Sequence, residues 1–87
     1  MKWTVILSRQ AAKDAKKLNG AGLKGKAEKL LDLLEEEPLR SPPEFEKLVG
    51  NLAGFFSRRI NIQHRLVYRL DRRRRTVHVL RMWTHYE

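Results

Sequence analysis

The sequence contains no cysteine, so neither a disulfide framework nor a thiolate metal site is available to it. Such a composition suits a reducing compartment. The N-terminal apolar run Trp3–Leu7 is too short for a signal peptide or for a membrane span of about 20 residues. We therefore expect a cytoplasmic protein that has no membrane partner.

Acidic residues are scarce in the second half of the chain, and the net charge is +9. Residues 1–45 hold nine Lys/Arg and seven Asp/Glu, whereas residues 46–87 hold ten and three. No acidic residue lies between Glu46 and Asp71. A basic half of this kind is typical of a nucleic-acid-binding protein. A solvated basic face, or a contact for an acidic protein, would produce the same pattern.

The length of 87 residues fits a single domain spanning residues 1–87. Hydrophobic spacing predicts a helix that is capped by Ser8 and a second helix over Leu23–Glu37. The segment Glu44–Gly50 fits either a short strand or a turn. Strands are predicted over Lys2–Leu7, Phe56–Ile62, His64–Leu70 and residues 76–83, with a turn at residues 71–75. The order β-α-α-β-β-β predicts an α+β fold, in which a two-helix hairpin packs on one face of a small antiparallel sheet.

The segment Asn51–Leu70 contains two short stretches that alternate apolar and polar residues and meet at residues 61–63. In a strand, Ile60 and Ile62 would face one way, and Ser57 and Arg59 the other. A second apolar row contains Leu66, Tyr68 and Leu70, with Arg65, Val67 and Arg69 behind it. Because arginine binds phosphate in a bidentate manner, the pattern predicts a phosphate-binding face on the sheet.

A ribonuclease that works without a metal needs a base, cations that stabilise the phosphorane, and an acid. Glu46 is the only carboxylate of the basic half before Asp71, and the acid could be His64, His78 or His85. The residues alone do not choose among the three histidines. They lack zinc-site spacing, and no phosphate-binding glycine loop is present. We therefore expect neither a metal nor a cofactor.

The pattern Asn-Leu-x-Gly-Phe-aromatic-Ser-Arg-Arg-Ile at residues 51–60, followed by His-Arg-Leu-Val-Tyr at residues 64–68, resembles the YoeB/Txe branch of the RelE/ParE toxin superfamily. The resemblance implies a RelE-like fold and a ribosome-dependent endoribonuclease toxin of a type II toxin–antitoxin module. Such toxins cleave mRNA in the ribosomal A site, next to rRNA, and so inhibit translation. The expected products have a 2′,3′-cyclic phosphate or 3′-phosphate and a 5′-OH. The resemblance also implies an acidic antitoxin of the YefM/Phd type, and it is compatible with a homodimer.

The resemblance also assigns roles to individual residues. Glu46 would be the general base, Arg65 would stabilise the phosphate, His85 would be the general acid, and Tyr86 would stack on or position the substrate. Further contacts to RNA phosphates are expected from Arg59, Lys47, Arg58 and Arg81.

Two alternative functions, each typical of another class of protein, would also explain these sequence features. A non-catalytic module could dock its basic sheet on RNA or on an acidic protein, and RNA cleavage would distinguish it from the toxin. A regulator that binds only protein would have negligible affinity for RNA, even at low salt.

Overall fold

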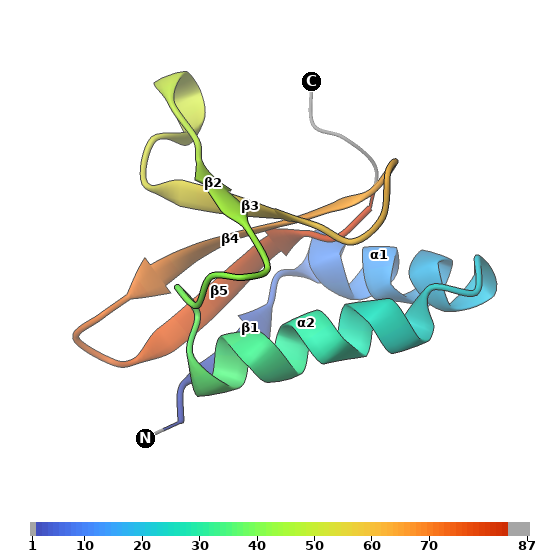
Figure 1. Cartoon of the computed structure of the whole chain (residues 1–87), viewed down its shortest axis with the longest axis horizontal. Helices are drawn as coiled ribbons and strands as arrows, with labels where there is room; N and C mark the ends of the chain where they lie inside the picture. Colours follow the sequence, from blue (N-terminus) through green and yellow to red (C-terminus); the bar gives the residue numbers. More distant parts are fainter. Residues whose placement is uncertain (1, 84–87) are drawn as a thin grey trace.

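The computed structural model describes residues 2–83 (Figure 1). This part of the chain contains the helices α1 (Arg9–Gly20) and α2 (Lys24–Glu36) and the strands β1 (Thr4–Leu7), β2 (Phe45–Lys47), β3 (Phe55–Arg59), β4 (Arg65–Asp71) and β5 (Thr76–Arg81). A 3-10 turn, η1 (Gly50–Leu52), lies between β2 and β3. Neither helix in this range is long and apolar enough to cross a membrane.

The strands form one sheet in the order β1-β5-β4-β3-β2. The predicted α+β fold, with a helical hairpin and a small sheet, is confirmed. The sheet is antiparallel except for the pair β1–β5, which is parallel. That pair makes the sheet mixed, and the parallel pairing is possible because both helices and the strands β2–β4 separate β1 from β5 along the chain. The ambiguous segment 44–50 contains the additional strand β2.

Strand β3 ends at Arg59 and not at the predicted Ile62. The carboxamide oxygen of Asn61 accepts hydrogen bonds from the backbone N–H of Gln63 (2.9 Å) and His64 (2.7 Å). This is the local turn that asparagine favours, and it interrupts the pleat. The predicted apolar row is therefore correct at Ile60, which is buried, and wrong at Ile62, which is 92% exposed.

The start of α1 is fixed by Ser8, as predicted. Its Oγ accepts a hydrogen bond from the backbone N–H of Ala11 (2.9 Å) and donates one to the carbonyl of Leu80 (2.8 Å). The second bond ties the helix to β5. After α1 the chain reverses at Gly22, whose φ of 77° lies in the left-handed region that glycine adopts without steric cost.

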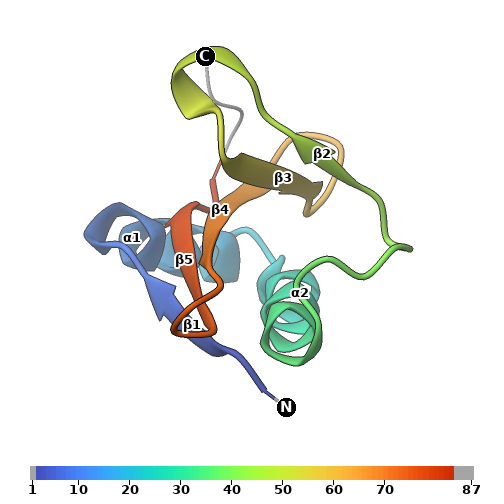
Figure 2. The ribbon, with the colours of Figure 1, turned by 90° about the vertical axis from the view of Figure 1, so that its left-hand side faces the viewer.

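A single core joins both helices to one face of the sheet (Figure 2). Its buried members are Ala11, Leu18, Ala27, Leu34, Phe56, Ile60, Leu66, Tyr68, Val77, Val79 and Met82. The predicted apolar row of β4 is confirmed at Leu66 and Tyr68. Since side chains alternate along a strand, Ser57, Arg59 and Arg65 project from the opposite face.

Candidate active site

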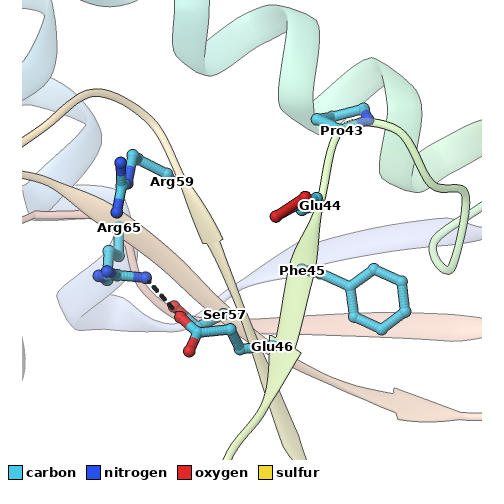
Figure 3. A pocket seen from close by; sticks show the side chains of 7 residues that line it. All are labelled: Pro43, Glu44, Phe45, Glu46, Ser57, Arg59 and Arg65. Carbon is cyan, nitrogen blue, oxygen red and sulfur yellow. Dashed lines mark hydrogen bonds and ion pairs between the residues drawn. The ribbon is translucent and has the colours of Figure 1, made fainter.

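A cleft of about 470 Å³ lies on that opposite face, at the edge of the sheet formed by β2 (Figure 3). Its walls are formed by Pro43, Glu44, Phe45, Glu46, Ser57, Arg59 and Arg65. These residues come from β2 and the segment before it, from β3, and from the first residue of β4. Residues up to 22 positions apart in sequence therefore meet at one surface.

The strand register brings the polar side chains of the cleft together. Glu46 on β2 lies opposite Ser57 on β3, and Arg59 on β3 lies opposite Arg65 on β4. Because Ser57 and Arg59 are separated by one residue, they share a face. The predicted juxtaposition of Glu46, Arg59 and Arg65 is thus present in the structure.

Glu46 and Arg65 form an ion pair, with 2.9 Å between Oε1 and Nη1 (Figure 3). The Glu46 side chain is 65% exposed and that of Arg65 is 27% exposed. Ion pairs this accessible to water contribute about 0–1 kcal/mol to stability. A substrate phosphate can therefore replace the carboxylate on Arg65 at little cost.

Arg59 forms no ion pair within residues 2–83. Like charges directly opposite each other on paired strands repel, and Arg59 faces Arg65 in this way. The cleft is lined by two carboxylates, Glu44 and Glu46, and by two guanidinium groups, and only the Glu46–Arg65 pair is in ion-pair contact. An anion bound between the two arginines would relieve their repulsion.

Ser57 is a member of the site that the sequence-based assignment left out. It is 1% exposed, and its Oγ has no hydrogen-bond partner among the described residues. A buried hydroxyl without a partner costs free energy, yet this one borders the cleft. Its position between the paired Glu46 and Arg65 suits a hydrogen bond to a bound polar group. The sequence signal that could have identified Ser57 is its spacing of two residues from Arg59, which places both side chains on one face of a strand.

Arg58 does not line the cleft, and its predicted phosphate contact is corrected by the structure. Its side chain is 1% exposed and lies on the core face. The guanidinium donates hydrogen bonds to the carbonyls of Pro43 (2.6 Å), Pro38 (2.9 Å) and Arg40 (2.8 Å). It also donates to the hydroxyl of Tyr68 (3.1 Å). Arg58 therefore fixes the segment 38–43, which leads into β2 and Glu46.

Burial raises the pKa of Tyr68 above its ordinary value of 10.0, and the adjacent Arg58 offsets this only in part. The neutral hydroxyl donates to the carbonyl of Pro38 (2.8 Å). Tyr68 thus joins Arg58 in holding the segment that enters β2.

Two further predicted RNA contacts lie outside the cleft. Lys47 is exposed on β2 but is paired with Phe56, so it alternates away from Glu46. Arg81 donates a hydrogen bond to the buried carboxylate of Asp14 (Nε to Oδ2, 3.0 Å). The Asp14 carboxylate also accepts from the backbone N–H of Met82 (3.0 Å). Arg81 therefore has a structural partner on α1.

The candidate acids are dispersed. His64 is buried and stacks on Trp83, with 3.9 Å between ring centroids. His78 lines a different hollow of about 230 Å³, near β1. His85 and Tyr86 lie outside the described residues. Within residues 2–83, no cluster of His, Cys, Asp or Glu could hold a metal ion.

The chain matches a family model along most of its length. The model describes the YoeB-like toxin of bacterial type II toxin–antitoxin systems, and it matches residues 10–86. A comparison with curated proteins gives no match.

Solved structures of toxins have the same fold. The YoeB/ParE toxin from Agrobacterium tumefaciens is 26% identical and superposes with a TM-score of 0.86 over 95% of this chain and 99% of that one. A chain of the YoeB–YefM complex from Staphylococcus aureus is 31% identical, with a TM-score of 0.80 over 99% and 100%. A chain of the toxin–antitoxin complex RelBE2 from Mycobacterium tuberculosis is 33% identical, with a TM-score of 0.76 over 98% and 100%. The chain therefore belongs to the YoeB-like toxins of bacterial type II toxin–antitoxin systems.

Proposed function

We propose that this toxin is an endoribonuclease that cleaves mRNA in the A site of the ribosome by acid–base chemistry. The observation that supports this most strongly is the cleft in which the Glu46 carboxylate lies 2.9 Å from Arg65, with Arg59 opposite Arg65. One proton acceptor and two phosphate-binding cations are the groups that the first half of the reaction needs.

The reaction begins when the scissile phosphate displaces Glu46 from Arg65. Glu46 then accepts the proton of the 2′-OH, and the 2′ oxygen attacks phosphorus. Arg65 and Arg59 stabilise the additional negative charge of the phosphorane. His85 donates a proton to the departing 5′ oxygen, which leaves a 2′,3′-cyclic phosphate and a 5′-OH. Hydrolysis of the cyclic phosphate gives the 3′-phosphate.

The remaining residues position the substrate. Tyr86 would stack on a base of the A-site codon, and base–aromatic stacking contributes about 1–3 kcal/mol. The unpartnered Oγ of Ser57 would donate to a phosphate oxygen between Glu46 and Arg65. Lys47, exposed at the edge of the sheet, would contact a flanking phosphate. Arg58 contributes indirectly, because it fixes the segment before β2.

The antitoxin would be an acidic protein. Its charge would complement the basic half of the chain, and a carboxylate seated between Arg59 and Arg65 would occupy the phosphate position. The Staphylococcus aureus relatives are described as a heterotetrameric YoeB–YefM complex and as a YoeB dimer. We extend both to this chain as proposals, namely an antitoxin of the YefM type and a homodimer of the free toxin.

The test adds purified toxin to ribosomes that translate a defined mRNA and maps new 5′ ends by primer extension. We compare the wild type with Glu46→Gln and with Glu36→Gln, which removes an exposed carboxylate from α2. Loss of a general base lowers the rate by about 10²–10⁴-fold, so Glu46→Gln should cleave at least 100-fold more slowly, whereas Glu36→Gln should match the wild type. Absence of cuts with folded wild-type toxin would favour a non-catalytic RNA-binding module.

A further inference from the structure

Four consecutive arginines, Arg72–Arg75, form the turn between β4 and β5 (orange in Figure 1). All four are exposed. Arg72, Arg73 and Arg74 form no ion pair with any described residue. Asp71, the acidic residue of the turn, uses its Oδ1 to accept a hydrogen bond from the backbone N–H of Arg74 (3.1 Å). Three guanidinium groups without an ion pair to any described residue thus lie together at the end of the sheet, beside the single carboxylate of Asp71.

The base of this arginine turn is held in place. The carbonyl of Arg75 accepts a hydrogen bond from the N–H of Thr4 (2.9 Å), and its guanidinium lies over the ring of Trp3 at 5.3 Å. The hydroxyl of Thr76 donates to the carbonyl of Arg74 (3.1 Å). Contacts to β1 and within the turn therefore fix its backbone, while the side chains of residues 72–74 remain available.

The arginine turn is remote from the cleft. Strand β4 begins with Arg65, in the cleft, and ends with Asp71. At about 3.4 Å per residue, its two ends are about 20 Å apart. This separation is more than twice the screening length of about 8 Å at physiological salt. The arginine turn therefore has little electrostatic influence on chemistry in the cleft.

We propose that the arginine turn is a second RNA-binding site, which takes the phosphate backbone of a double-stranded RNA helix. The inference deepens the proposed function, because it names the structured RNA on which the toxin would dock. Arginine forks match phosphate geometry, and contacts to double-stranded RNA are made mainly to phosphates and 2′-hydroxyls. Residues 71–76 include no aromatic side chain on which a single-stranded base could stack, and the neighbouring ring of Trp3 is in contact with the guanidinium of Arg75. They also lack a large apolar side chain for the dry centre of a protein interface.

The test measures anisotropy of a fluorescein-labelled RNA duplex of about 16 base pairs at KCl concentrations from about 50 to about 200 mM. The test variant is Arg72→Gln/Arg73→Gln/Arg74→Gln. The control variant, Lys13→Gln/Lys26→Gln/Lys29→Gln, removes three exposed charges from the helices, so both lose the same net charge. Thermal melts of both variants verify that they are folded.

Each lost phosphate contact lowers the slope of log K against log salt by about 0.7–0.9. The test variant should therefore lose about two units of slope, and the control less than one. Equal slopes in the two variants would overturn the proposal, since net charge alone would then explain the binding. The proposal would also be overturned if the test variant lost as much affinity for a polyglutamate peptide as for the RNA duplex.

Cleavage on ribosomes separates this inference from the proposed function. The test variant should cleave slowly at limiting ribosome concentration and reach the wild-type rate at saturation. A lower rate at saturation would place the arginine turn in the reaction and contradict a docking role. If the wild type binds the duplex through this turn but cleaves nothing, the second site stands and the proposed nuclease is wrong.

Discussion

Replacing Arg58 by methionine tests whether this buried guanidinium holds the cleft in shape. Arg58 makes four hydrogen bonds, three to carbonyls of the segment 38–43 and one to Tyr68. Methionine retains most of the volume and the apolar contacts but removes every donor. The change therefore isolates the polar contribution of Arg58.

The expected cost is smaller than the sum of the lost bonds. Hydrogen bonds to charged groups contribute about 1.5–3 kcal/mol each, but methionine also avoids the desolvation of a buried charge, which costs several kcal/mol. The carbonyl of Pro38 keeps its bond from the Tyr68 hydroxyl, and Arg40 and Pro43 are exposed, so water can reach their carbonyls. We expect a net loss of about 3 kcal/mol in the free energy of unfolding, because the avoided desolvation offsets part of the lost hydrogen bonds.

Urea denaturation followed by circular dichroism measures this loss. A loss of about 3 kcal/mol lowers the melting temperature by about 12–24 °C in a domain of this size. Arg69→Met is the matched control, because Arg69 is exposed on β4 and surface changes cost less than about 0.5 kcal/mol. A loss below about 1 kcal/mol for Arg58→Met would refute the reasoning.

Three other changes have definite expected outcomes. Ser57→Ala should leave stability unchanged or slightly higher, since the Oγ has no partner, and should weaken substrate binding in the cleavage assay; a loss of stability instead would reveal a structural hydroxyl. Asp14→Asn should lower stability at pH 7 by about 2 kcal/mol. Burial would raise the pKa of Asp14, but hydrogen bonds from Met82, Gln10 and Arg81 outweigh this effect and hold the pKa below its ordinary value of 3.8. The difference in stability between Asp14→Asn and the wild type should therefore persist above about pH 4 and shrink as the pH falls further. A difference that does not depend on pH would contradict this. Ile62→Lys should cost less than about 0.5 kcal/mol in urea denaturation, and a larger cost would show that Ile62 is buried in solution.

The period of two in β3 and β4 was sufficient to place Arg59 and Arg65 on one face and Leu66 and Tyr68 on the other. The same period places Arg58 beside Phe56 and Ile60. The sequence does not reveal how the charged guanidinium of Arg58 is accommodated on the core face. Its carbonyl acceptors lie 15–20 residues away in sequence, and no pattern of side chains predicts the position of a backbone carbonyl.

Two features of the sheet were also beyond sequence patterns. Strand β2 has three residues, too few for alternation to be visible. The parallel pairing of β1 with β5 aligns Thr4 with Thr76, and neither strand indicates its partner by composition. The juxtaposition of Glu46 with Arg65 depends on the pairing of β2 with β3, so the family resemblance predicted it and periodicity did not.

The central claim is that the 2′-OH of the A-site codon is the nucleophile and that Glu46 removes its proton. The most direct measurement uses ribosomes programmed with mRNA in which a single A-site nucleotide is 2′-deoxy. We predict that cleavage after that nucleotide is abolished, while unmodified mRNA is cut to a 5′-OH and a 2′,3′-cyclic phosphate. Cleavage at the deoxynucleotide at an undiminished rate would contradict the mechanism and the role of Glu46.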